Sequence, residues 1–205
     1  VVQRAKRLGS LALQVQWVKG DAKKAEASFF KINQQAAPID ATELRLLKAR
    51  TLPNAVSARA IIRAGTGHKY WSKFDEATRK QVESIAKEIN SLLFTPELKT
   101  PIKTLDLPVA GRGYSSRTLP LVFDFVNISN SVTSDKDLVP DLDGSKTLEY
   151  LRKCRSLVNR MTGTNAASLG FHPAVYFYSA SGRYQPTAFL AMLVLIKELD
   201  QSNGF

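Results

Sequence analysis

The chain has 205 residues, of which 44% are apolar and 23% are charged, and it contains one cysteine. This apolar fraction excludes a fully disordered chain, and a single cysteine excludes a scaffold held together by disulfides. The longest purely apolar run, residues 188–196, is 9 residues long. A membrane-spanning helix needs roughly 20 apolar residues, so this run does not predict one.

The net charge of +11 favours an anionic partner, with nucleic acid first, over an excess of lysine that serves only solubility. Residues 1–103 carry 19 Lys or Arg and 9 Asp or Glu, whereas residues 104–205 carry 10 and 9. Because almost all of the excess lies in the first half, we predict a basic face for a polyanion. The chain starts at Val1 and shows no signal-peptide core, so we expect part of a longer cytoplasmic protein.

The first fifty residues predict one strand followed by two helices. Apolar and polar residues alternate over 11–17, which is typical of a half-buried strand with Trp17 on its apolar side. Asp21 is a suitable N-cap for a helix over residues 21–34, and Pro38 follows that helix. Glu43 completes a capping-box pattern at the start of the next helix.

The rest of the chain is predicted to be helical, apart from a long proline- and glycine-containing loop over residues 95–118. Asp75 is the expected N-cap of a long helix, and the helix over 186–201 is apolar on almost every side, which predicts a central, buried position. The predicted helices span residues 54–64, 75–94, 119–131, 145–161 and 186–201.

These elements define a mainly α protein, a helical bundle with one N-terminal strand. We expect that strand to complete a small sheet with upstream residues, which would make the full protein α+β. Four segments follow from the pattern, namely 1–52, 53–94, 95–118 and 119–205.

Two groups of charges receive structural interpretations. Glu76–Lys80 and Glu83–Lys87 are spaced as i,i+4 ion pairs on a solvated face. The cations on the polar side of the helix over 145–161 are expected to pair with the acidic loop over 135–143. They are Arg152, Lys153, Arg155 and Arg160.

No complete catalytic constellation is present, and we predict no catalytic residue, no metal ligand and no evident cofactor. Cys154 lies mid-helix and is interpreted as a small buried hydrophobic residue, with a reactive thiol as the alternative. Asp141 to Gly144 resembles part of a calcium loop. The first and twelfth positions of that loop would be Val139 and Tyr150, which carry no carboxylate, so the calcium site is rejected.

The segment from Ala64 to Trp71 contains the leading candidate for anion binding. Gly65-Thr66-Gly67 is typical of a helix C-terminus, and the alternative is a phosphate contact made by backbone N–H groups, His68 and Lys69. In that alternative Tyr70 and Trp71 stack on bases, and Arg59 and Arg63 extend the basic patch.

Two loops combine arginine, tyrosine and glycine in the same way. The loop over 111–117 contains Arg112 and Arg117, and the loop over 179–184 contains Arg183. Each is a candidate nucleic-acid contact, although a turn that exposes an arginine is the favoured interpretation of both.

Residues 29–44 carry a family resemblance. Phe29-Phe30-Lys31-Ile32-Asn33, followed by Pro38-Ile39 and Glu43-Leu44, resembles a stretch of the bacterial DGQQR-motif family, which has a ParB/sulfiredoxin-like fold. That family occurs in modification-dependent restriction enzymes and phage-defence proteins. The resemblance implies that Phe29 is a core residue and that Asn33 lies near a nucleotide or DNA pocket.

The resemblance covers about residues 8–50, and Ala36 stands where the family often has glycine. The Asp-Gly-Gln-Gln-Arg motif, to which the family's nucleotide hydrolysis is tied, is not in this chain. A nucleoside triphosphate and an upstream domain of the same protein are therefore implied by the resemblance alone, and no activity is transferred to these residues.

We therefore expect the nucleic-acid- or nucleotide-binding portion of a DGQQR-like restriction or phage-defence protein. The alternative is a helical protein–protein interaction module whose basic face meets an acidic partner. A standalone hydrolase is disfavoured because no nucleophile and base pair is recognisable. The oligomeric state is not predicted.

Overall fold

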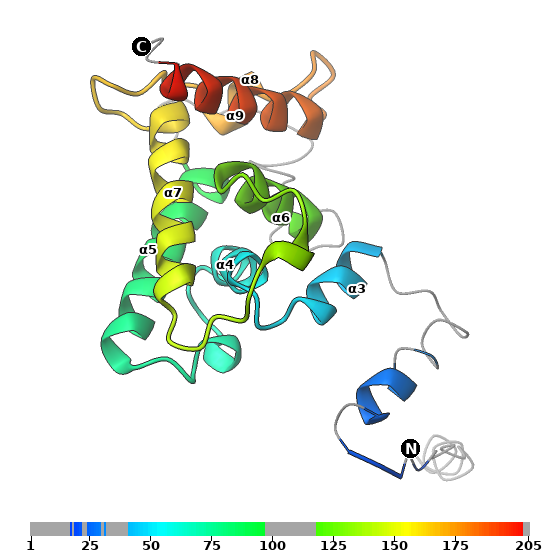
Figure 1. Ribbon diagram of the computed structural model, residues 1–205. Coiled ribbons are helices and arrows are strands. Elements are labelled where there is room, and N and C mark those ends of the chain that lie inside the picture. The colour runs from blue at the N-terminus through cyan, green and yellow to red at the C-terminus, as the bar shows by residue number, and fades with distance from the viewer. Residues whose placement is uncertain are drawn as a thin grey trace, which may run out of the picture. The chain divides into compact units, whose positions relative to one another are not determined.

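The computed structural model describes residues 17, 19–21, 24–29, 31, 41–96 and 118–202. The chain divides into two compact units, Val1–Asp40 and Ala41–Phe205. Each unit is described by itself (Figure 1).

In the first unit, residues 24–29 and residue 31 are helical. The side chain of Asp21 accepts a hydrogen bond of 2.9 Å from the backbone N–H of Lys24, which confirms Asp21 as the cap of this helix. Phe29 is 53% exposed, so the expectation that it is a core residue is wrong for the unit described. Trp17 is 89% exposed and is not in a strand. Residues 11–16, Asn33 and Pro38 lie outside the described residues.

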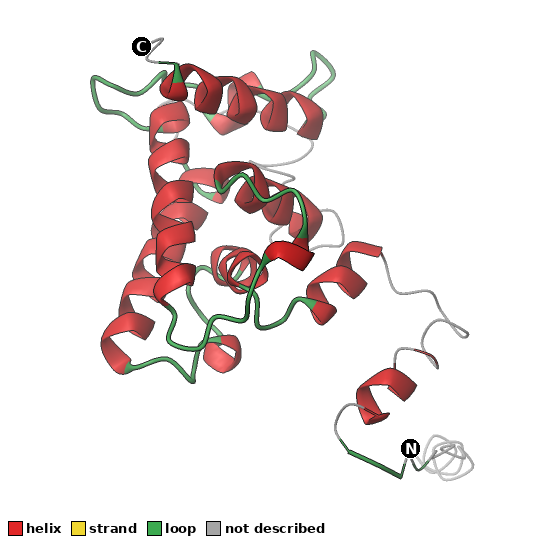
Figure 2. Cartoon of the chain, in the orientation of Figure 1, coloured by secondary structure: helices red, strands yellow, loops and turns green. Residues whose placement is uncertain are grey.

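The second unit is helical, and the described part of the chain contains no strand (Figure 2). Its one isolated antiparallel bridge joins Tyr178 and Tyr184. This confirms the mainly α fold class. The elements in chain order are α3 (Ala41–Lys48), α4 (Pro53–Ile62), η1 (His68–Tyr70), α5 (Glu76–Phe94), α6 (Thr118–Ser129), η2 (Asp135–Asp137), α7 (Ser145–Thr162), α8 (Pro173–Tyr176) and α9 (Pro186–Gln201).

Helix α4 is the centre of this unit. All ten of its residues are buried, and it packs against α5, α6 and α7 (Figure 1). The small side chains of Ala55, Ala58 and Ala60 lie on different sides of the helix and are completely buried. Small residues on several sides allow more than one neighbour to approach closely, which suits a helix surrounded by others.

Helices α5 and α7 form the longest pair, and they pack against each other. The side chain of Asp75 accepts a hydrogen bond from the backbone N–H of Thr78, which confirms the predicted N-cap of α5. The predicted apolar stripe of α5 faces the core, with Val82, Ile85 and Ile89 buried.

Helix α9 is not central, contrary to prediction. It packs against α6 and α7, and its buried positions are Phe189, Leu193 and Ile196. Val194 and Leu195 are 39% and 48% exposed. A uniformly apolar helix is expected to be buried on all sides, but α9 has neighbours on only part of its circumference among the described residues.

The acidic loop between α6 and α7 makes polar contacts with α3 and with the start of α7. Asp141 is buried and accepts hydrogen bonds from the backbone N–H of Gly144 at 3.0 Å and of Thr147 at 2.7 Å. Asp135 receives two hydrogen bonds from the guanidinium of Arg45 on α3. These carboxylates therefore cap α7 and tie α3 to the loop.

Candidate nucleic-acid interface

The turn after α4 is a helix C-terminus, which confirms the first of the two interpretations of this segment. Ala64, Gly65 and Gly67 have positive φ angles of 49°, 72° and 74°, and the N–H of Gly65 donates to the carbonyl of Ala60 at 2.9 Å. The N–H groups of residues 64, 65, 66 and 69 all donate to carbonyls of the chain itself. These four N–H groups are therefore not free to contact a phosphate.

Trp71 anchors this turn to α5. Its ring is completely buried, and its indole N–H donates to the carboxylate of Glu83 at 3.1 Å. A β-carbon added at Gly65 would lie 2.2 Å from the backbone oxygen of Glu83, so the turn rests directly on α5. The prediction that Trp71 stacks on a base is wrong, because a buried ring has no free face.

Arg59 also has a structural role. Its side chain is buried, and its Nη2 donates to the carbonyl of Leu46 at 2.9 Å. Its guanidinium lies 4.3 Å from the centroid of the Tyr70 ring, a cation–π contact between α4 and η1. Arg59 is therefore buried in the packing of α3, α4 and η1 and does not extend an exposed patch, contrary to the prediction. Tyr70 is half-buried, and the Arg59 guanidinium packs over its ring.

Arg63 and Lys69 are exposed at the same turn. The guanidinium of Arg63 lies across Gly67, since a β-carbon there would be 2.4 Å from Nη1, and it is 5.9 Å from the Tyr70 ring. Lys69 follows Gly67 closely, and its N–H donates to the Gly67 carbonyl at 2.8 Å. His68 begins η1 between these residues.

Two cations of α5 flank Glu83, the residue whose backbone contacts this turn. Arg79 and Lys87 lie four residues before and after Glu83, and therefore one helical turn to either side of it on the same face. We call Arg63, Lys69, Arg79 and Lys87 the basic corner. None of the four makes an ion pair with any described residue.

Sequence reasoning missed Arg79 and Lys87 as members of this surface. The expected Glu83–Lys87 ion pair does not form, and Glu83 instead accepts the indole N–H of Trp71. The expected Glu76–Lys80 pair is confirmed at 2.7 Å. The four-residue spacing of Arg79, Glu83 and Lys87 is visible in the sequence. The sequence does not show that Glu83 contacts the buried Trp71.

The hollow beside the corner is too small for a nucleotide. It measures about 160 Å³ and lies between α3, the end of α4 and η1. Pockets for drug-sized ligands measure roughly 300–1,000 Å³. The corner is therefore a surface rather than a pocket. The lining residues are Glu43, Leu46, Leu47, Arg59, Arg63, Tyr70 and Leu119.

The cations of α7 pair with their own helix, α5 and α9 and not with the acidic loop, contrary to prediction. Lys153 contacts Glu149 at 2.9 Å, and Arg155 contacts Glu88 of α5 at 3.4 Å. Arg160 lies 3.7 Å from Asp200 of α9. Three carboxylates of the acidic loop have other partners, since Asp135 holds Arg45 and Asp141 and Asp143 cap α7.

The remaining predicted contacts do not join the corner. Arg183 is exposed on a turn in which the N–H of Ser179 donates to its carbonyl at 2.8 Å. Among the described residues, no hydrogen bond links Arg183 to Arg63 or Lys69. Arg112 and Arg117 lie outside the described residues.

Cys154 and Asp141, the residues considered for a reactive thiol and a calcium site, both have structural roles. Cys154 is completely buried, and this burial raises the pKa of its thiol to about 12, which confirms the interpretation as a buried hydrophobic residue. Asp141 has both carboxylate oxygens occupied by N–H and hydroxyl donors of Gly144 and Thr147. In the part of the chain that the structure describes, no three His, Cys, Asp or Glu side chains are grouped to hold a metal ion.

Comparisons with known proteins matched no family model, no curated protein and no solved structure. Within the described ranges, no helix has the length and apolarity needed to cross a membrane.

Proposed function

We propose that this chain binds nucleic acid through the basic corner, as the binding portion of a DGQQR-like restriction or phage-defence protein. One observation supports this most directly. Residues 41–96 carry 10 cations and 5 carboxylates, whereas residues 118–202 carry 8 of each. The charge asymmetry of the sequence is therefore retained within the described bundle.

Ion pairing increases the difference in charge between these two parts of the bundle. In α7 the cations Lys146, Lys153 and Arg155 face carboxylates. The basic corner has no such partner among the described residues, and Glu83, which lies between Arg79 and Lys87 on α5, accepts the indole N–H of Trp71. A cation without an ion pair keeps its full attraction for a phosphate, because no intramolecular contact has to be broken first.

The geometry favours nucleic acid over a free nucleotide. The corner is an exposed surface on one turn and one helix face, and the hollow beside it holds about 160 Å³. Phosphates of a nucleic-acid backbone reach such a surface without entering a pocket, and their contacts give affinity without sequence information.

The test is the salt dependence of binding to a labelled 20-nucleotide strand, measured by fluorescence anisotropy with the full chain. Four phosphate contacts predict a slope of log K against log salt of about −2.8 for this single strand and about −3.6 for a duplex. Affinity should then fall roughly 50- to 150-fold between 50 and 200 mM salt.

The variant Lys69→Gln with Lys87→Gln should reduce the slope by about one for each residue. Lys80→Gln is the matched control, because Lys80 lies on α5 but pairs with Glu76. A double variant that keeps the wild-type slope, or a slope near zero for the wild type, would contradict the proposal. Far-UV circular dichroism shows whether each variant remains folded.

A protein-binding module is the second candidate, and a specific observation favours it. An apolar hollow of about 420 Å³ lies between α3 and η2 and is lined in part by Leu44, Ala49 and Leu52. Val139 and Leu142 on the nearby loop are 72% and 76% exposed. Apolar surface of this kind is typical of protein contacts. Absence of oligonucleotide binding would favour this function over the first.

A further inference from the structure

A hollow lined mainly by polar and charged residues lies between α7, α9 and the end of α6, in the part of the bundle whose net charge is zero. It measures about 260 Å³. Two lysines from different helices and three serines contribute to its wall. Its lining residues include Ser129, Ser131, Lys153, Ser156, Lys197 and Asp200.

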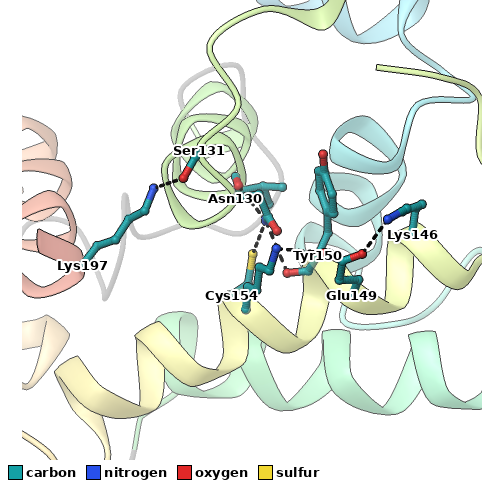
Figure 3. Close-up of polar contacts among 9 residues, drawn as sticks. Asn130, Ser131, Lys146, Glu149, Tyr150, Cys154 and Lys197 are labelled. Atoms are coloured by element: carbon teal, nitrogen blue, oxygen red, sulfur yellow. Dashed lines mark hydrogen bonds and ion pairs between the residues drawn. The ribbon is translucent and has the colours of Figure 1, made fainter. Parts of the chain in front are cut away.

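Lys197 reaches this hollow from α9 and is fixed at the end of α6 (Figure 3). Its Nζ donates to the carbonyl of Ile128 at 2.6 Å and to the hydroxyl of Ser131 at 2.6 Å. An ammonium group has three N–H donors, so one donor is left for a ligand. Ser131 has a positive φ of 57°, which places it just past the end of α6.

Lys153 approaches from α7 and keeps donors of its own. Its Nζ donates to Glu149 at 2.9 Å, and Glu149 also accepts from Lys146 at 2.9 Å. The two ammonium groups together lower the pKa of Glu149 to about 2. One carboxylate is thus shared between two lysines, and only Lys153 of the two lines the hollow.

The two lysines of the hollow repel each other. Burial and the charge of Lys153 both lower the pKa of Lys197, which means that its positive charge is not fully compensated. Asp200 is the one carboxylate in the wall, and its oxygen lies 3.7 Å from Nε of Arg160. The wall of the hollow therefore carries two ammonium groups and one carboxylate, which leaves a positive balance.

We propose that this hollow binds a phosphate-class anion, held by Lys153, Lys197 and the hydroxyl groups of Ser131 and Ser156. A tetrahedral oxyanion accepts several hydrogen bonds at once and relieves the repulsion between the two ammonium groups. The volume exceeds the roughly 30 Å³ of a water molecule and is below the roughly 300 Å³ of a drug-sized pocket. The hollow therefore has room for a phosphate group, and the rest of a larger ligand would extend outside it.

This proposal does not depend on nucleic-acid binding at the basic corner, because the two sites share no residue. The same chemistry is offered by inorganic phosphate and by a terminal phosphate on an oligonucleotide. The probe is inorganic phosphate, titrated into the full chain at constant ionic strength and followed by isothermal titration calorimetry.

The chain offers a matched pair of variants. Lys146→Met and Lys153→Met each remove one lysine from the same carboxylate, Glu149, but only Lys153 lines the hollow. We expect saturable phosphate binding by the wild type, a loss of at least about tenfold in Lys153→Met, and less than about twofold change in Lys146→Met. Both variants should fold, because the side chains of Lys146 and Lys153 are 61% and 51% accessible.

Equal weakening in both lysine variants would overturn the proposal, as would the absence of saturable binding up to about 10 mM phosphate. Ser156→Ala is a second variant, which leaves all charges in place and should weaken binding several-fold. Competition by a 5′-phosphorylated strand, but not by its 5′-hydroxyl counterpart, assigns the site to terminal phosphates. Competition by neither strand assigns it to free phosphate. Lys153→Met should leave the salt slope of oligonucleotide binding unchanged, which separates the two sites.

Discussion

Replacing Gly65 with alanine tests the close approach of the turn after α4 to α5. Gly65 has a φ of +72°, and the added β-carbon would lie 2.2 Å from the backbone oxygen of Glu83. Gly170 is the matched control, because its φ is +69° and an added β-carbon there meets nothing within 4 Å. Both substitutions therefore carry the same backbone strain, and only Gly65→Ala adds a steric contact.

The magnitudes follow from these two terms. An L-residue in the left-handed region costs roughly 1–2 kcal/mol, and alanine offsets roughly 0.4–1 kcal/mol of this by restricting the unfolded chain. Gly170→Ala should then destabilise the protein by about 1 kcal/mol. At Gly65 the turn and α5 must also separate by about 1 Å to restore normal van der Waals contact. Overpacking of this kind costs roughly 1–3 kcal/mol, so we expect Gly65→Ala to cost about 2–4 kcal/mol.

Urea unfolding followed by tryptophan fluorescence measures this difference. The chain has two tryptophans, so Trp17→Phe leaves the buried Trp71 as the sole reporter, directly beside the turn. Far-UV circular dichroism on the same samples checks that both probes give one transition. If the free energies of unfolding of the two alanine variants agree within about 0.5 kcal/mol, the close contact between the turn and α5 is refuted.

Three other predictions concern the loop between α6 and α7 and the core beside it. Asp141→Ala should lower the free energy of unfolding by about 2–4 kcal/mol in urea titrations, since buried N–H donors lose their acceptor, and a smaller cost than that of the exposed Asp143→Ala would contradict this. The guanidinium of Arg45 lowers the pKa of Asp135. The stability that their pair contributes is complete above the unfolded pKa of about 3.9 and is lost as the pH falls through the lower folded pKa. Asp135→Asn should therefore flatten the acid limb of Tm against pH, and an unchanged limb would refute the coupling. With its thiol pKa raised to about 12, Cys154 should react with Ellman's reagent only on unfolding, and rapid reaction of the native protein would refute its burial.

The local pattern of the sequence determined most of the helices. Asp75 caps α5, and the 3.6-residue spacing of Val82, Ile85 and Ile89 places one apolar face of that helix in the core. The glycines after α4 end it as predicted, since left-handed φ values favour glycine. These features depend on residues within one or two turns of one another, so they can be predicted without knowledge of the fold.

The candidate site was predicted only in part. The position of the basic patch, at the turn that carries Arg63 and Lys69, follows from charge and composition. Its membership does not, because a sequence does not distinguish an exposed aromatic or arginine from a buried one. Trp71 and Arg59 are buried, and Glu83 is recruited by Trp71, which leaves Lys87 without its expected partner.

The sequence by itself determined the helical class, most helix boundaries and the concentration of positive charge in the first half. Only the tertiary structure decided that α4 is central, that α9 keeps part of its apolar surface exposed, and that Asp141 caps α7. The physical reason is that periodicity shows which face of a helix avoids water but not how many neighbours cover it. That number depends on contacts between residues far apart in the chain, such as the pair Arg45 and Asp135, and these form only when the bundle assembles.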